Sequence, residues 1–304
     1  MLNRLSRLGV TIALSMLFAV VSATAGPITF SAGGANPAAI QATADVFRTA
    51  LGALNPNVAG SFGAGRREIN WDGVPDALSA PNPLPANFFN VNSPRGVVFS
   101  TPGTSFQTSA NAGVAPVRFD NINATYSTQF QTFSPQRLFT SVGSNITDIN
   151  FFVPGSTTAS FTSGFGAVFV DVDLANTTAI QFFDILGLSL GTFFAPVANN
   201  GLSFLGVQFN AGERIGRVRI TSGNTPVGPT EAVGLDVVVM DDFIYGEPAA
   251  VPEPPTTLLL GAGLLAIALA RRPKSRYVDE VAASTGIGSN RRSWFDPKSA
   301  AGAG

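Results

Sequence analysis

The chain has 304 residues and a net charge of −1 at neutral pH, and it contains neither histidine nor cysteine. This composition excludes Ser–His–Asp and Cys–His catalysis, disulfide bonds, and zinc sites built from Cys and His. Residues 26–255 carry 9 Arg and 16 acidic groups, a net of −7, whereas residues 271–304 carry 7 basic and 3 acidic groups, a net of +4. An acidic central region without lysine also argues against nucleic acid as a partner.

The N-terminus has the features of an export signal. Two arginines precede an uncharged apolar stretch over residues 8–21, and Ala23 and Ala25 occupy the small-x-small positions before Gly26. This order is typical of a secretory signal peptide. We therefore predict that residues 1–25 are removed by cleavage before Gly26.

Residues 26–64 form an N-terminal segment in which one helix is expected. Asn36-Pro37 is a typical helix start, with Asn as N-cap and Pro at the first helical position. Apolar residues then recur at helical spacing as far as Leu54, and Asn55-Pro56 ends the run. We predict a helix over residues 37–54 that covers one end of a sheet.

Residues 65–247 predict an all-β domain, a β-sandwich or jelly roll, because short β-type runs alternate with Gly, Pro, Asn and Ser. The run at 164–173 is apolar on both faces, which predicts a strand in the middle of a layered core. In the run at 215–221, Val218 and Ile220 alternate with arginines, which predicts a half-solvated antiparallel strand. The predicted strands are Arg67–Trp71, Gly96–Ser100, Ser127–Phe133, Ile146–Val153, Gly164–Asp173, Thr178–Asp184, Ser189–Phe194, Ser203–Phe209, Ile215–Thr221 and Leu235–Tyr245.

A short motif, Val251-Pro252-Glu253-Pro254, precedes an uncharged apolar run over residues 255–270 and then Arg271-Arg272. As a helix the run spans about 24 Å, short of the roughly 30 Å hydrocarbon core of a bilayer, so we expect a marginal transmembrane anchor. The acidic region before it and the basic residues after it fit a cytoplasmic tail. The three features in this order resemble the PEP-CTERM sorting signal, here over residues 248–272.

The resemblance implies that exosortase, a membrane transpeptidase-like enzyme of Gram-negative bacteria, recognises the chain. It further implies transient residence in the inner membrane and then transfer to the cell surface or the extracellular space. An ordinary C-terminal membrane anchor is the alternative interpretation. Residues 273–304 lack apolar periodicity and are predicted to form a basic, disordered tail.

Two pairs of carboxylates are candidate metal ligands. Asp171 and Asp173 end a predicted strand on one face, about 7 Å apart, and Asp241 and Asp242 follow an apolar run. The run from Met240 to Tyr245 resembles the closing strand of galactose-binding-like jelly rolls, which implies a structural Ca²⁺ held by oxygen ligands. The alternative is that these aspartates cap turns or accept hydrogen bonds from backbone amides.

Trp71 and Asp72 are candidate ligand-binding residues, because sugar sites combine an aromatic face with a carboxylate; Tyr126 and Tyr245 are further possible contacts. A single Trp next to a Gly-containing turn is more often a core residue, since Trp is highly buried on average. The leading hypothesis is a non-enzymatic structural or adhesive surface protein, with extracellular polysaccharide as a partner and no catalytic residue. The alternatives are a carbohydrate-binding module with structural calcium and a glycoside hydrolase with two carboxylates about 5–10 Å apart.

Overall fold

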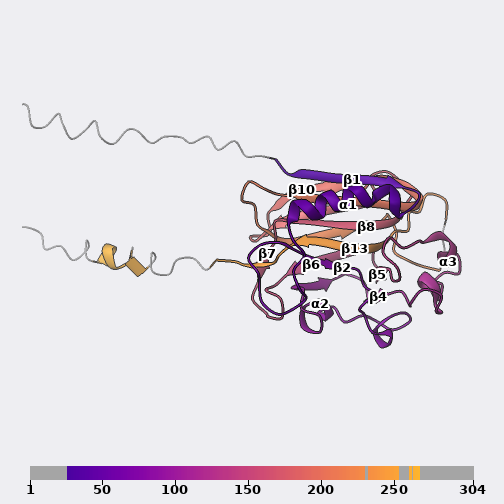
Figure 1. The fold of residues 1–304 in the computed structure, drawn as a ribbon, viewed down its shortest axis with the longest axis horizontal. Helices are drawn as coiled ribbons and strands as arrows, with labels where there is room; N and C mark the ends of the chain where they lie inside the picture. The colour runs from indigo at the N-terminus through magenta and orange to yellow at the C-terminus, as the bar shows by residue number, and fades with distance from the viewer. Residues whose placement is uncertain (1–25, 230–231, 253–259, 262, 268–304) are drawn as a thin grey trace, which may run out of the picture. The chain divides into compact units, whose positions relative to one another are not determined.

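The computed structural model describes residues 26–229, 232–252, 260–261 and 263–267, and the chain divides into two compact units after Pro252. Antiparallel strands make up most of the regular secondary structure of the first unit, which confirms the predicted all-β class (Figure 1). The predicted signal peptide over residues 1–25 and the predicted tail over residues 273–304 lie outside the described residues.

The described part of the first unit contains one long helix and several short ones. The helices are α1 (Pro37–Leu51), η1 (Asp76–Leu78), α2 (Phe88–Val91), η2 (Val117–Phe119) and α3 (Tyr126–Gln129). The strands are β1 (Ile28–Gly34), β2 (Arg66–Ile69), β3 (Val97–Ser100), β4 (Ser105–Thr108), β5 (Phe139–Val142), β6 (Ile146–Phe151), β7 (Ser160–Phe161), β8 (Gly164–Val172), β9 (Ala179–Asp184), β10 (Ser189–Phe194), β11 (Ala198–Gln208), β12 (Ile215–Thr221), β13 (Val239–Gly246) and β14 (Ala249–Ala250).

Two sheets form the sandwich. The larger sheet has the order β1-β11-β8-β13-β5-β4, and β2 pairs with the second half of β13. The smaller sheet has the order β10-β9-β12-β6-β3, and β14 pairs with β7 in a separate two-stranded ladder. The bounds of β12 are those predicted, and its Val218 and Ile220 are buried while Arg217 and Arg219 are partly exposed.

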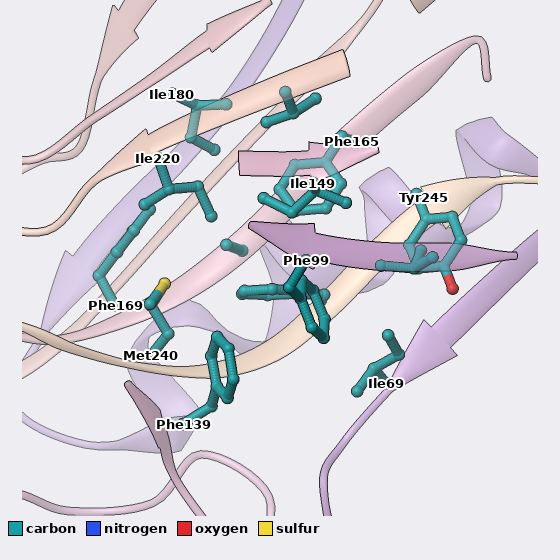
Figure 2. Close-up of a cluster of buried hydrophobic side chains, with 14 of the residues drawn as sticks. Ile69, Phe99, Phe139, Ile149, Phe165, Phe169, Ile180, Ile220, Met240 and Tyr245 are labelled. Carbon is teal, nitrogen blue, oxygen red and sulfur yellow. The ribbon is translucent and has the colours of Figure 1, made fainter. Parts of the chain in front are cut away.

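Apolar side chains from both sheets fill the space between them (Figure 2). In β8, Phe165, Ala167 and Phe169 enter this core, whereas Val168 and Val170 point to the opposite face of the larger sheet. The prediction that this strand is buried on both faces is therefore confirmed. Residues that Figure 2 labels in this core are Ile69, Phe99, Phe139, Ile149, Phe165, Phe169, Ile180, Ile220, Met240 and Tyr245.

Helix α1 covers the outer face of the larger sheet and makes the molecule three layers deep. Its buried stripe is Ile40, Ala44, Phe47 and Leu51, which recur at three- and four-residue intervals. Phe47 lies 5.6 Å from the ring of Phe204 in β11, centroid to centroid. The helix starts at Pro37 as predicted but ends at Leu51, before the predicted residue 54.

The earlier end of α1 has a local cause. Gly52 adopts a φ of 100°, a conformation that a residue with a side chain rarely adopts, and its N–H donates to the carbonyls of Arg48 and Thr49. Leu54 then forms an isolated parallel bridge with Arg66 instead of a further helical turn. The chain is thereby turned from the helix toward β2.

The predicted strand Ser127–Phe133 is wrong. The chain instead forms α3, and the rings of Tyr126 and Phe130 lie 4.6 Å apart, because residues four apart share one face of a helix. Both side chains are buried under this loop region. The sequence also failed to reveal β1, β4 and β5, which are short or lie at or near an edge of the larger sheet, and the two-residue strands β7 and β14.

In the second unit, residues 260–261 and 263–267 are helical, within the apolar run where a helix was predicted. Leu260, Leu264, Leu265 and Ile267 on this helix are exposed. Among the described residues, none of the helices has both the length and the apolar character needed to cross a membrane.

Candidate functional site

The edge strand β14 ends where the proline-flanked motif begins. Its Ala249 and Ala250 pair with β7, and the N–H of Val251 donates to the carbonyl of Ala159 at 3.4 Å. The sandwich therefore holds the chain up to the first residue of the motif, and no linker separates the two. The other predicted signal residues Glu253, Pro254, Arg271 and Arg272 lie outside the described residues, as do the cleavage residues Ala23 and Ala25.

A buried ion pair stabilises the segment just before β14. Nε of Arg67 donates to Oε2 of Glu247 at 2.7 Å, and Nη2 donates to Oε1 at 2.9 Å. Neither side chain is exposed by more than 1%. The other guanidinium N–H groups of Arg67 donate to backbone carbonyls of residues 56, 58, 60 and 94. The pair thus fixes two loops and the exit of the chain to one another.

This ion pair was not predicted from the sequence. Arg66 and Arg67 are adjacent in the sequence, and no pattern indicates that Arg67 points inward while Arg66 is partly exposed. Arg67 and Glu247 are 180 residues apart, so their proximity depends on the pairing of β2 with β13.

Asp241 and Asp242 occupy a bulge in the centre of β13. Met240 pairs with Phe169 and Phe243 with Ala167, so three steps along β13 oppose two along β8. The bulge turns both carboxylates away from the inter-sheet core. Asp241 accepts the N–H of Phe133 at 2.6 Å, and the hydroxyl of Ser134 donates to Asp242 at 2.6 Å.

The pair Asp241–Asp242 is almost inaccessible to solvent, with 0% and 3% exposure. Burial raises the pKa of Asp241 well above its usual range, and the neighbouring charge of Asp242 adds to this effect. Burial likewise raises the pKa of Asp242, while Ser134 and Arg48 oppose that rise. Nη2 of Arg48 in α1 lies 3.2 Å from Oδ2 of Asp242. These carboxylates therefore join α1 and the 133–134 loop to the central strand.

Asp171 and Asp173 line an open pocket of 440 Å³ at the far end of β8. Asp173 lies near enough for its charge to act on the carboxyl group of Asp171. Asp171 has a φ of 69°, which breaks the strand alternation at this point. Its carboxylate accepts the N–H of Asn200 at 2.7 Å.

The electrostatics of this pocket favour a proton on Asp171. Burial raises the pKa of Asp171 to about 7; the hydrogen bond from Asn200 opposes this rise, and the charges of Asp173 and Asp236 add to it. Asp236, which the sequence analysis did not single out, accepts the N–H of Asp173 at 3.0 Å and the hydroxyl of Thr177. Asp236 is completely buried, and no motif in the sequence marks it.

Within the described residues, no group of three or more Asp or Glu side chains is arranged to hold a metal ion. Each of the predicted pairs has protein partners instead. Asp241 and Asp242 bind backbone and hydroxyl donors and Arg48, and Asp171 binds the backbone of Asn200. These contacts match the alternative stated for the aspartates, in which they accept hydrogen bonds from the protein.

Trp71 is a core residue. It is 1% exposed, its ring stacks on Phe139 with centroids 4.0 Å apart, and its Nε1–H donates to the carbonyl of Asp241 at 2.8 Å. A sugar could not reach the ring without opening the core. Asp72, at the surface, accepts the N–H of Gln136 at 2.6 Å and a side-chain hydrogen bond from Asn70. The structure therefore places Trp71 in the core and Asp72 in a turn at the surface, which separates the two predicted ligand-binding residues.

Comparison with known proteins identifies the C-terminal segment. The family described as PEP-CTERM protein-sorting motif matches residues 250–272. The match starts within β14, so the sandwich and the sorting motif adjoin without a gap. No curated protein and no solved structure matches the chain. The likeness of β13 to a galactose-binding-like jelly roll therefore stays a prediction.

The motif defines the class of protein. A chain that carries a PEP-CTERM sorting motif is a protein destined for export and for sorting by exosortase to the outside of the cell. The predicted recognition of this signal at residues 248–272 is thus confirmed, with a boundary that differs by two residues.

Proposed function

We propose that this chain is a non-enzymatic structural or adhesive protein of the cell surface or extracellular matrix of a Gram-negative bacterium. In this proposal a signal peptide over residues 1–25 directs export, and the apolar run over residues 255–270 holds the chain in the inner membrane. Exosortase then processes the chain near Val251 and releases or transfers the β-sandwich. The observation that carries the proposal is the sorting motif directly after the last edge strand of a folded β domain.

The two aspartate pairs give little support to the glycoside hydrolase alternative. Glycosidases place two carboxyl groups about 5–10 Å apart, on either side of the scissile bond. Asp171 accepts a backbone N–H from Asn200, and Asp241 and Asp242 are buried and accept hydrogen bonds from protein donors. A structural role agrees better with both arrangements. The buried Trp71 likewise gives no support to a carbohydrate-binding platform at that residue.

Intact-mass measurement of the protein isolated from producing cells tests the sorting part of the proposal. The mature chain should start at Gly26 and end near Val251. The triple substitution Pro252→Ala, Glu253→Ala and Pro254→Ala should leave residues up to 304 attached and retain the protein in the membrane. Glu213→Ala, a change of one partly exposed loop carboxylate, is the control and should be processed normally. Equal processing of all three proteins would contradict the proposal.

The structural role is tested separately by the variant Asp171→Asn/Asp173→Asn. The variant and the wild type are each expressed in cells that lack the gene. If the protein is not an enzyme, both should restore surface or matrix retention to the same extent. A loss of function in a variant that is normally folded and sorted would instead indicate a catalytic or ligand-binding role for the 440 Å³ pocket.

A further inference from the structure

The turn between β9 and β10 presents apolar side chains to solvent. Ile185 is 36% exposed, Leu186 78% and Leu188 63%. The turn itself does not require them, because Asp184 and Gly187, with a φ of 82°, supply its geometry. Clustered exposed aliphatic residues at a hairpin tip are typical of an interaction surface.

Three backbone N–H groups of this turn have acceptors within the turn. The N–H groups of Leu186 and Leu188 both donate to Oδ1 of Asp184 at 2.8 Å, and the N–H of Gly187 donates to the carbonyl of Asp184 at 3.0 Å. A turn with unsatisfied N–H groups would pay a large desolvation penalty in lipid. The tip therefore combines exposed apolar side chains with three N–H groups, those of residues 186–188, that need no water.

The tip lies at the end of the sandwich from which the chain leaves. Asp184, Ile185 and Gly187 line one pocket of 290 Å³ together with Val251 and with Ser160 of β7. Figure 1 shows β7 at the same end as the start of β1. The pocket at Asp171 is at the other end of β8, because β7 precedes the first residue of that strand.

Two further exposed apolar residues belong to this end. Val58 is 49% exposed and Phe62 50%. Their loop is joined to the exit of the chain, since the N–H of Gly60 donates to the carbonyl of Pro154 and the N–H of Phe62 donates to Glu247. Apolar side chains from two separate loops thus flank the point where the chain leaves the sandwich.

The charges at this end are mixed, with one exposed cation beside β7. The guanidinium of Arg214 lies 5.1 Å from the ring centroid of Phe161. Arg217 is bound to Asp148, Asp184 is hydrogen-bonded within its turn, and Glu213 accepts a backbone N–H. An exposed arginine next to apolar loops is suited to an anionic lipid surface.

The length of the chain limits how far this end can be from the membrane. Only residues 252–254 separate Val251 from the apolar run that starts at residue 255. Three extended residues span at most about 10 Å. If the apolar run lies in the bilayer, as the proposed function requires, the exit end must lie against the headgroups.

We propose that this end of the sandwich is a membrane-facing surface, and that the Ile185–Leu188 tip enters the lipid interface while the chain is anchored. The occupant is the outer leaflet of the membrane that holds the sorting segment. The inference rests on the proposed function and extends it, because it assigns an orientation to the folded domain before processing.

The absence of cysteine makes a direct test possible. The full chain is prepared as Leu186→Cys and, as a matched control at the other end, as Val233→Cys; both positions are exposed, so neither change should disturb folding. Each protein is labelled with an environment-sensitive dye and reconstituted into vesicles of phosphatidylethanolamine and phosphatidylglycerol. The Leu186→Cys probe should shift to shorter wavelength and be quenched by nitroxide-labelled lipid, and the Val233→Cys probe should do neither.

The outcomes separate this inference from the proposed function. If the chain floats with the vesicles but the Leu186→Cys probe stays in water, the membrane-facing surface is wrong and the anchor stands. A wavelength shift without quenching by lipid nitroxide indicates contact with another protein copy and also overturns the inference. If the chain does not float with vesicles, both the anchor and the membrane-facing surface are wrong.

Discussion

The substitution Glu247→Gln removes the negative charge from the buried ion pair beside the exit strand and nearly preserves the side-chain shape. Arg67 would keep its charge in a position with no solvent exposure. The carboxylate accepts two hydrogen bonds from Arg67, one from Asn55 at 2.8 Å and one from the N–H of Phe62 at 3.3 Å. The amide of glutamine can accept at only one of its two positions, so part of this network is lost.

Breaking a buried ion pair by removing one partner typically costs about 3–5 kcal/mol, because the remaining charge stays desolvated. The backbone carbonyls around Arg67 continue to accept its N–H groups, so we expect a loss near the lower limit, about 3 kcal/mol in the free energy of unfolding. The matched control is Asp45→Asn, the same change of acid to amide in a pair with Arg48. The side chain of Asp45 is 55% exposed, so this control should cost no more than about 0.5 kcal/mol.

Urea unfolding of residues 26–252 measures both costs. Trp71 is the only tryptophan in this range. Its ring is buried against Phe139, so its fluorescence reports directly on the sandwich core. Equal costs for the two variants, or a loss below about 1 kcal/mol for Glu247→Gln, would refute the argument that the pair is a desolvated ion pair that stabilises the fold.

Three further predictions concern the pocket, the helix and metal binding. The pKa of Asp171 is about 7 in the folded state and about 3.9 in the unfolded state, so between these values the folded state holds a proton and the free energy of unfolding should fall as pH rises. In urea melts at several pH values, Asp171→Asn should flatten this dependence of stability on pH. An unchanged dependence would contradict the raised pKa. Phe47→Ala should lower the free energy of unfolding by about 3–5 kcal/mol in the same assay. Val46→Ala, on the exposed face of α1, should have little effect. Similar losses of stability in the two variants would contradict the packing of α1 on the sheet. Calcium or a chelator should leave the melting temperature unchanged, because Asp241 and Asp242 already have protein partners. A calcium-dependent rise in melting temperature that Asp171→Asn abolishes would reveal a metal site in the pocket at Asp171.

The sequence predicted those elements whose pattern is local and strong. The alternation over residues 215–221 gave β12 with its observed bounds, and the doubly apolar run over 164–173 gave the central strand β8. The edge strand β1 was missed because one face is exposed and it ends in two glycines, which leaves a weak apolar signal. At Ser127–Phe133 a strand was predicted where the chain forms the end of a short helix, Tyr126–Gln129.

The surroundings of the aspartates could not be predicted because their partners are distant in the sequence. Arg48 and Asp242 are 194 residues apart and meet only when α1 packs on the larger sheet. Asp171 has a positive φ, which is uncommon for a residue with a side chain and which no local pattern predicts. By contrast, the sorting motif is contiguous in the chain, and it was predictable from the sequence alone.

The position of β13 has a consequence for the timing of folding. This last long strand inserts between β8 on one side and β5 and β2 on the other. Until residues 239–246 have emerged on the outer side of the membrane, the larger sheet would consist of two halves with open edges, which are prone to aggregation. Folding dominated by such long-range pairing is intrinsically slow. The sandwich can therefore close only when translocation has nearly reached the sorting segment, and release before that point would yield a chain unable to complete its central sheet.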